Sequence, residues 1–477
     1  MSDSIVINGE AVESTSDIIV GSVVQQTVDI PADRSVIFAS QSEDDVINVD
    51  GSAADFSVSS GSGNELTFTG GQAEHGIQLF DDAATIGFSD GTELTARVVD
   101  DGDGGEQVQL GGDVVDDTFN LTSAIAGQDG AGIVTDGPVD GSTVFVDQNG
   151  NGEQDEGEPT ATSNANGLFQ FGEVDTSGGD IIATGGTDTS TGRDIDGTLE
   201  APSGSNVVSP ITSVINRVAK TSGTSTEEAT QAVNRAFGLS EDVDPTRDAP
   251  SVIIGDSGSS DEQKGAAAQL QSVQSQIAST ASLSASAASG TSGSDDRDGA
   301  ANSALDSIAQ AVSDSAGNGD NGDSDDEDGG NEDQGGSVDL SDQNTVSSIV
   351  SNTVKNVATA NGTTVDEETV NSVSDSVSQI ASNVNRNMRD AVTNNEDSAS
   401  AVAEIVRNQD VAQNDAAEQV SQGATDGNLD DATTNFTGDR LNDAADQSGA
   451  NVPDDIDNQT PEEDDSGPAT TNFAPRS

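Results

Sequence analysis

The pattern of apolar and polar residues in the N-terminal part of the chain predicts short β-strands. β-Branched or alternating runs recur at close spacing, as at 36–38 and 94–98, and turn-forming pairs such as Asp50-Gly51 separate them. Such pairs supply the positive φ values that tight turns require. Residues 1–115 are therefore predicted to form an all-β module of the small sandwich or roll type, followed by a mixed linker at 116–136.

A second β module is predicted at 137–200. Runs rich in β-branched and aromatic residues lie at 143–146, 167–171 and 180–183. An acidic segment rich in Asn and Gly separates the first of these runs from the second. We expect both β modules to be of the β-sandwich type.

Beyond residue 200 the apolar period becomes helical. Ser209 fits an N-cap with Pro210 at the first helical position, and Ser225 and Glu228 form the capping box of a further helix. Apolar residues share one face of the first of these helices: Ile211, Val214, Ile215 and Val218. This pattern predicts a Ser/Ala/Asn-rich helical module at 201–288.

The next segments differ mainly in charge. Residues 289–343 are rich in Gly, Ser, Asn and acidic residues and are predicted to form a disordered, self-repelling linker, interrupted by a weak helix near 301–312. A second helical region is predicted at 344–447. The acidic tail at 448–477 contains Pro and is predicted to be disordered.

Within the second helical region, Thr364 and Glu367 form another capping box. Apolar residues then recur at alternating intervals of three and four: Val370, Val373, Val377, Ile380 and Val384. Such a seam is typical of a short coiled coil or of one helix in a small bundle, and we favour the bundle.

The charge balance excludes several classes of protein. The chain has 87 acidic against 15 basic residues, a net charge of −72, and only 31% apolar residues. Such a surface repels nucleic-acid phosphates and anionic membranes, and no apolar run is long enough to span a bilayer. Because the chain has no Cys, disulfides and thiolate chemistry are impossible. We expect no nucleic-acid partner and no membrane insertion.

The acidity itself has two other interpretations. Lys is nearly absent, at Lys220, Lys264 and Lys355 only. An acidic, Lys-poor surface stays soluble at high salt, where cations screen its self-repulsion. Low hydropathy with high net charge is also the composition of disordered chains. A salt-adapted protein and a chain with long unfolded segments both fit this composition.

One segment, 147–158, fits the twelve-residue calcium loop at every constrained position. Calcium takes about six to eight oxygen ligands, which alternate positions of a tight loop can direct inward together. The expected ligands are the side chains of Asp147, Asn149, Asn151, Asp155 and Glu158 and the backbone carbonyl of Glu153, with Gly152 at the sharp bend. An acidic Asn-Gly turn that fits by chance is the alternative. Because the loop follows a predicted strand and precedes Pro159, we do not expect a helix–loop–helix hand.

The sequence around this loop resembles the B-type repeats of bacterial surface adhesins. The resemblance rests on VDGSTVFVDQNGNG at 139–152, DEGEP at 155–159 and NANGLFQF at 164–171. Those repeats are prealbumin-like β-sandwich modules whose Asp-Asn-Gly loop binds calcium, and the resemblance implies the same fold and cofactor here. The continuation, at 184–188 and 201–212, looks like a segment common in large secreted proteins of aquatic bacteria, many of which are exported by type I systems.

Two features depart from this resemblance. The module lacks Lys, which excludes the Lys–Asn isopeptide crosslink of many adhesin repeats, and the chain lacks the Gly-rich nonapeptide array typical of type I substrates. The N-terminal residues also lack the basic segment and apolar stretch of a Sec signal peptide. We expect an extracellular or cell-surface protein without a Sec-type signal peptide, exported by a type I-like route.

No catalytic site is predicted. Gly255-Asp256-Ser257-Gly258 superficially matches a serine-protease nucleophile signature, but that chemistry needs a neighbouring base. The only His, His75, lies in a Gly-rich turn of another module and is expected at the surface. Paired carboxylates are too abundant here to indicate glycoside hydrolysis, and no Trp or Tyr is present to stack on a sugar.

Together these features predict a secreted or cell-surface, non-catalytic structural or adhesive protein that is stabilised by calcium. Its helical region is a candidate for self-association. The alternatives are a salt-adapted acidic binding protein without a specific role for calcium, and an undetected hydrolase.

Overall fold

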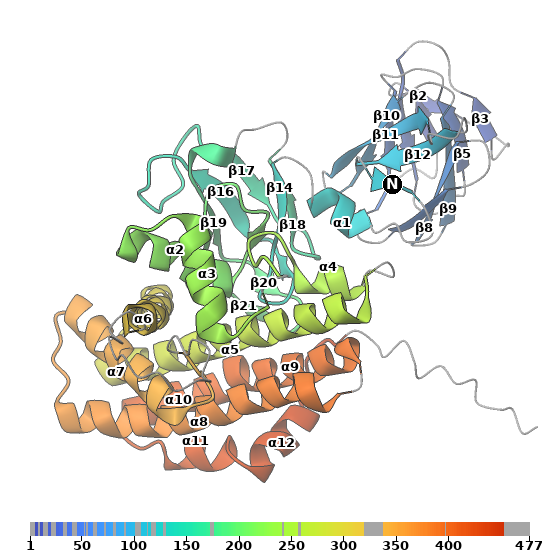
Figure 1. The fold of residues 1–477 in the computed structure, drawn as a ribbon. Helices are drawn as coiled ribbons and strands as arrows, with labels where there is room; N and C mark the ends of the chain where they lie inside the picture. The colour runs from blue at the N-terminus through green and yellow to red at the C-terminus, as the bar shows by residue number, and fades with distance from the viewer. Residues whose placement is uncertain are drawn as a thin grey trace, which may run out of the picture.

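The computed structural model describes most of the chain up to residue 452. The described residues are 5–7, 10–12, 18–20, 25–31, 36–40, 45–51, 53, 56–60, 64–70, 73–79, 83–89, 92–100, 106–111, 113–115, 121–126, 130–171, 176–240, 243–255, 259–318, 337–395 and 397–452. An N-terminal β-rich part precedes a helical C-terminal part, as the sequence predicts at this coarse level (Figure 1).

The strands of the N-terminal module pair into two sheets. In chain order they are β1 (Ile5–Ile7), β2 (Glu10–Val12), β3 (Ile18–Val20), β4 (Thr27–Ile30), β5 (Val36–Ser40), β6 (Val46–Val49), β7 (Phe56–Ser60), β8 (Glu65–Gly70), β9 (Ala73–Leu79), β10 (Ala83–Phe88), β11 (Glu93–Asp100), β12 (Glu106–Leu110) and β13 (Asp113–Val114). The eight-stranded sheet has the order β13-β12-β11-β10-β6-β4-β1-β2, and the five-stranded sheet the order β3-β5-β9-β8-β7.

Both sheets contain parallel neighbours, because the chain passes through the other sheet between them: β5 separates β4 from β6 in sequence, and β7–β9 separate β6 from β10. Val28 pairs with Ile47 and Ile47 with Ile86, so that three buried aliphatic side chains lie in register across β4, β6 and β10. Strands β3, β5 and β9 are parallel in the other sheet. Next to the aliphatic ladder, Asn48 Nδ2 donates to Asp29 Oδ1 at 2.7 Å. The core of this module is therefore built from strands that are neighbours in the sheet but not in the sequence.

The second β module begins at β14, inside the predicted linker 116–136, which also contains helix α1 (Leu121–Ala126). Its elements are β14 (Ala131–Val134), β15 (Val139–Asp140), β16 (Thr143–Asp147), β17 (Thr160–Thr162), β18 (Leu168–Gln170), the 3-10 helix η2 (Thr176–Gly178), β19 (Asp180–Thr184), β20 (Thr187–Asp188), β21 (Arg193–Asp194), β22 (Thr198–Ala201) and β23 (Val207–Val208). They form sheets of the orders β17-β16-β19-β22, β18-β14-β23 and β15-β20-β21. The β18-β14-β23 sheet contributes Ile133, Leu168 and Val207 to the hydrophobic cluster of the first module.

The helices assemble around α5, which packs against α6, α7, α8, α9 and α10 (Figure 1). The helices are α2 (Pro210–Ser222), α3 (Thr226–Phe237), α4 (Pro250–Gly255), α5 (Asp261–Ser292), α6 (Arg297–Asn318), α7 (Gln343–Ala360), α8 (Glu367–Asn394), α9 (Ser398–Val411), the π-helical turn η3 (Ala412–Ala416), α10 (Ala417–Asp426), α11 (Asp430–Asn435) and α12 (Asp439–Asp446). One hydrophobic cluster joins Leu283 of α5 to Val377 of α8. The helical segments predicted as two regions therefore share a core.

Helix α5 can occupy the centre of the bundle because its side chains are small. Ser284, Ala287 and Ala288 are fully buried, and at Gly290 a Cβ atom would lie 2.4 Å from the carbonyl oxygen of Ser421 in α10. Small residues let neighbouring helix backbones approach one another this closely. The small Ser, Ala and Gly residues of α5 thus allow close helix packing.

Helix α6 corrects part of the prediction for 289–343. Its Ala304, Ile308 and Val312 belong to a hydrophobic cluster that also contains residues of α2 and α5. These apolar residues recur at helical spacing, and their burial outweighs the acidic composition of the segment. The acidic run 320–328 and the tail from 453 onward lie outside the described residues.

Helix caps test the sequence patterns directly. Ser209 and Ser225 are the N-caps of α2 and α3, as predicted. Ser225 forms the predicted capping box with Glu228, and Ser209 forms a capping box with Thr212 that the sequence pattern does not predict. Helix α8 is capped instead by Asp366, whose side chain accepts a hydrogen bond from the Thr369 backbone N–H. Thr364 therefore lies outside the helix, which corrects the second predicted capping box.

The apolar seam of α8 lies in the bundle core. Its members Val370, Val377 and Val384 are buried in the cluster that contains Leu283. This is the bundle packing that we favour from the sequence. None of the helices in the described part of the chain is long and apolar enough to cross a membrane.

Candidate metal centre

The predicted calcium loop, 147–158, connects β16 to β17. Asp147 is the last residue of β16 and is 5% exposed, whereas most of the loop beyond it is exposed. The sheet fixes the start of the loop, because β16 pairs with β17 on one side and β19 on the other. A Cβ atom at Gly179 would lie 2.1 Å from the Asp147 carbonyl oxygen, so the backbone there packs directly against the base of the loop.

The Asp147 carboxylate organises the first turn of the loop. Its Oδ1 accepts hydrogen bonds from the backbone N–H groups of Gly150 at 2.7 Å and Asn151 at 3.2 Å, and its Oδ2 accepts from Gly152 at 2.8 Å. Gly150 and Gly152 have φ values of 75° and 77°, which side chains with a Cβ rarely adopt. Backbone donors therefore surround this carboxylate.

Asn149 and Asn151 both direct their side-chain amides to Asp155. Each Nδ2 donates to Asp155 Oδ2 at 2.7 Å. The Oδ1 atoms accept backbone hydrogen bonds, Asn149 from Asn151 at 3.0 Å and Asn151 from Glu153 at 2.8 Å. Three of the predicted ligand side chains thus converge. A half-turn of an amide exchanges its donor for an acceptor, so such a side chain can also present oxygen to a cation.

Glu158 closes the loop. Its Oε1 accepts from the backbone N–H of Gln148 at 2.9 Å, and its Oε2 accepts from that of Asp155 at 3.0 Å. Both carboxylate oxygens are therefore turned toward the loop. The side chain of Glu153 is exposed, like those of most other residues of the loop.

The donor set fits a hard cation in its chemistry. Asp147, Asp155 and Glu158 supply carboxylates, and the two Asn residues supply amide oxygens, which are the ligand types that calcium prefers. Across the described ranges, no group of three or more acidic, His or Cys side chains has the spacing of a metal site. The carboxylates instead accept hydrogen bonds within the loop. Calcium binding by this loop stays a prediction.

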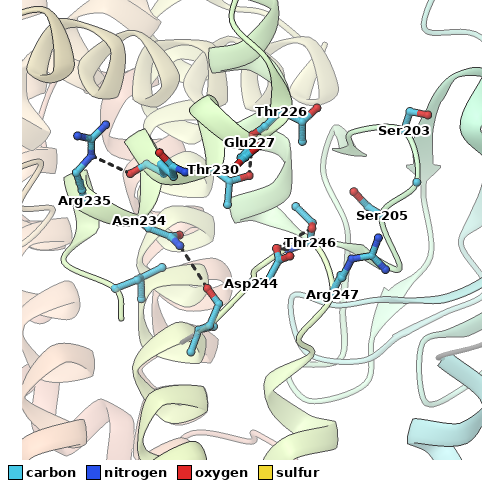
Figure 2. Close-up of a pocket in the computed structure, with 14 residues that line it drawn as sticks. Ser203, Ser205, Thr226, Glu227, Thr230, Asn234, Arg235, Asp244, Thr246 and Arg247 are labelled. Carbon is cyan, nitrogen blue, oxygen red and sulfur yellow. Dashed lines mark hydrogen bonds between the residues drawn. The ribbon is translucent and has the colours of Figure 1, made fainter. Parts of the chain in front are cut away.

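A second candidate site is a polar cleft of about 740 Å³ beside α3, shown in Figure 2. Asn234 Nδ2 donates to the Val243 carbonyl at 3.3 Å and joins its two walls. Hydroxyl groups line it on both sides, at Ser203, Ser205, Thr226, Thr230 and Thr246. None of its described lining residues is aromatic, so it offers no stacking platform. The sequence pattern does not single out these residues, because they come from three separate segments.

The structure places His75 differently from its predicted surface position. His75 lies on β9, is fully buried, and has its ring centroid 6.0 Å from that of Phe56. Burial lowers its pKa. A histidine enclosed among aromatic side chains cannot be reached by a substrate. In the protease-like signature, Gly255 ends α4, and residues 256–258 lie outside the described part of the chain.

No protein-family model, curated protein or solved structure matches this chain.

Proposed function

We propose that this chain is a non-catalytic structural or adhesive protein of the cell surface or extracellular medium, and that calcium bound by the loop 147–158 stabilises its second β module. The observation that carries this proposal is the convergence of Asn149 and Asn151 on Asp155, next to an Asp147 carboxylate surrounded by backbone donors. Alternating side chains that turn inward are the arrangement on which twelve-residue calcium loops depend.

Calcium would act on the strands that flank the loop. Asp147 ends β16, and Glu158 lies just before β17. A cation held by both residues would tie together the ends of an antiparallel pair. Because only the folded loop gathers these ligands, calcium at a hundred times its dissociation constant would stabilise the protein by about 2.7 kcal/mol.

The surrounding fold supports the same proposal. The β16 and β18 sheets both contribute to a cluster that includes Val144, Phe169 and Ile181, which is the hydrophobic core that the proposed β-sandwich requires. In this proposal the protein reaches the outside of the cell by a type I-like route, and its helical part is the candidate for self-association.

Calorimetric melting in the presence of different cations tests the calcium role. When CaCl2 is added in excess over EDTA, the Tm of the wild-type protein should rise until it saturates. The Tm of Asp147→Ala and of Glu158→Ala should not rise. Asp140→Ala, an exposed carboxylate of the same module outside the loop, is the matched control and should respond like wild type. Stabilisation by molar NaCl alone, with no effect of the loop substitutions, would favour the salt-adapted alternative.

The proposed location has its own test. The producing culture is separated into cells, surface wash and medium, and the chain is quantified in each fraction. We expect it in the surface wash or the medium. Retention inside the cells would contradict the extracellular assignment without bearing on calcium binding.

A further inference from the structure

Two carboxylates are buried where the second β module meets the helical bundle. Asp136 follows β14 and is 5% exposed, and Asp188 ends β20 and is fully buried. The segment after Asp136 packs tightly against Asp188, since a Cβ atom at Gly137 would lie 2.2 Å from Asp188 Oδ1. Ionised carboxylates are costly to bury without a cationic partner. Neither of the two forms an ion pair with another described residue.

The helical bundle holds Asp136 through two glutamines. Gln409 of α9 donates from Nε2 to the backbone oxygen of Asp136 at 3.0 Å and to its Oδ1 at 2.9 Å. Gln413 of the π-helical turn η3 donates to Oδ2 at 2.9 Å. Gln409 Oε1 in turn accepts from Ser275 Oγ of α5 at 2.6 Å. The carboxylate thus connects a β-strand end to the centre of the bundle.

Asp188 is held by its own turn, which also contacts η3. Its Oδ1 accepts from the Ser190 backbone N–H at 2.8 Å, and its Oδ2 accepts from Thr191 Oγ1 at 2.9 Å. Asn414 of η3 donates from Nδ2 to the Thr191 carbonyl at 3.3 Å. All four carboxylate oxygens of the pair therefore have hydrogen-bond donors.

Few other charges face this pair. The charge of Arg193 of β21 acts on Asp136, but Arg193 binds Asp196 at 2.7 Å, and Asp196 also binds Arg297 at 3.1 Å. Asp410 of α9 faces the contact as well and accepts from Asn414 at 2.6 Å.

A cavity of about 50 Å³ adjoins Asp136, with Arg193, Asp194, Asp196 and Ser282 in its lining. The buried hydroxyl of Ser282 has no partner among the described residues. A water molecule occupies about 30 Å³, so the cavity has room for water to exchange a proton with Asp136.

We propose that Asp136 and Asp188 share one proton at the contact between the second β module and the helical bundle, and that loss of this proton loosens the contact. The pair then acts as a pH-sensitive latch: the contact is more stable at low pH, where the proton is bound, and less stable at high pH. This inference is independent of calcium binding by the loop 147–158.

The direction follows from the environment of Asp136. Burial and then the charge of Asp188 raise the pKa of Asp136 to about 7, against the weaker lowering by Gln413, Gln409 and Arg193. Burial raises the pKa of Asp188 as well. Two like charges in one buried site do not both ionise readily, so one proton stays with the pair. A group whose pKa is raised on folding stabilises fully below its ordinary value, and that stabilisation is lost as pH rises through the raised value.

Hydrogen exchange of the full-length protein in EDTA tests the latch. After correction for intrinsic exchange, the protection of the η3 amides, Ala412–Ala416, should fall about tenfold between pH 6 and pH 8, as expected for one proton bound with a pKa near 7. Asp136→Asn, which carries no titrating proton, should remove this fall. Asp45→Asn replaces a buried carboxylate of the first module and should retain it.

Three outcomes would overturn the proposal: an unchanged protection between pH 6 and pH 8 in wild type, the same tenfold fall in Asp136→Asn, or a pH dependence that appears only with calcium and not in EDTA. Carbon-13 NMR of the wild-type Asp carboxyl groups keeps the proposal testable if Asp136→Asn does not fold. It should reveal one carboxyl that titrates between pH 6 and pH 8, and the absence of such a group would contradict the shared proton.

Discussion

Asp147 is the residue on which the loop conformation depends, with or without a cation. Its carboxylate accepts three backbone hydrogen bonds at the buried end of the loop, whereas Asp155 accepts two from exposed Asn side chains. Asp147→Ala leaves those N–H groups without their acceptor, and loss of hydrogen bonds to a buried charge costs about 1–3 kcal/mol.

Calorimetric melting in EDTA should therefore give a lower Tm for Asp147→Ala and a smaller decrease for Asp155→Ala. Calcium is absent from this comparison, so the result reports only on the hydrogen bonds of the loop. Equal effects of the two substitutions would contradict the central place of Asp147.

His75 makes the first β module sensitive to acid. Burial lowers its pKa below the ordinary 6.5, so the unfolded chain binds the proton first as the pH falls. The stability that neutral His75 contributes is present above pH 6.5 and is lost progressively below it. His75→Leu should remove this loss.

Urea unfolding followed by circular dichroism at pH 7.5 and pH 5 measures this effect, since the chain has no Trp or Tyr to serve as a fluorescence probe. Asp136 contributes with the opposite sign, but equally in wild type and variant. The difference between the two proteins therefore isolates His75, the only His in the chain. An identical pH dependence in both would mean that His75 is not held neutral.

At the scale of elements, two glycines of α5 provide a matched test of the close packing in the bundle. A Cβ atom at Gly290 would meet the Ser421 carbonyl oxygen at 2.4 Å, whereas at Gly265 it would meet nothing within 4 Å. Gly265→Ala should stabilise the protein by up to about 1 kcal/mol through helix propensity. Gly290→Ala should destabilise it by about 1–3 kcal/mol, because the backbone of α10 must move. Thermal melting of the two variants measures these effects. Changes in Tm of the same sign in both variants would contradict the close packing of α5 against α10.

Substitutions at the start of α8 distinguish the observed N-cap, Asp366, from the predicted one, Thr364. The backbone N–H and then the hydroxyl of Thr369 lower the pKa of Asp366 by donating to its carboxylate. Asp366→Ala should lower Tm at pH 7, and Thr364→Ala should leave it unchanged. Because the pKa is lowered on folding, the difference between wild type and Asp366→Ala should shrink as the pH falls below 3.8. If Thr364→Ala lowered Tm more than Asp366→Ala, the result would contradict the observed cap and favour the capping box that the sequence predicts.

Local patterns predicted the elements whose structure is decided locally. Ser209 and Ser225 cap their helices because a cap needs only the next three residues. The cap of α8 was assigned to the wrong residue because Thr364 and Asp366 both lie just before the helix, and the spacing to Glu367 favours the former. Helix α6 was underestimated because its acidic surroundings conceal a regular apolar face.

At the scale of the whole molecule, the features that sequence did not reveal are those made by distant segments. Gln409 and Asp136 are 273 positions apart, and no local pattern connects them. His75 is buried because β9 lies between β5 and β8 in its sheet and the ring packs against Phe56, which a turn-like sequence does not indicate. The loop 147–158 is the opposite case. All its predicted ligands lie within one continuous segment, so their spacing alone was enough to identify them as candidates.

Because the net charge is −72, the stability of the whole molecule depends on cations, both basic side chains and dissolved ions. A few basic residues hold the β and helical parts together, among them Arg217 of α2, which pairs with Glu200 of β22 at 2.7 Å. Most other carboxylates repel one another, and dissolved salt screens that repulsion without selecting a site. A specific calcium site is distinguished from general screening by its stoichiometry and by its dependence on individual residues.

Isothermal titration calorimetry of calcium into the EDTA-treated, dialysed protein at constant NaCl tests this claim most directly. Wild type should bind one calcium ion saturably, with a dissociation constant in the range of about 10⁻⁶ to 10⁻³ M. Glu158→Gln, which keeps an acceptor but loses the charge, should bind at least about tenfold more weakly, a loss of about 1.4 kcal/mol. Asp140→Asn should bind like wild type. The absence of saturable binding, or equal affinity in Glu158→Gln and wild type, would contradict the assignment of calcium to this loop.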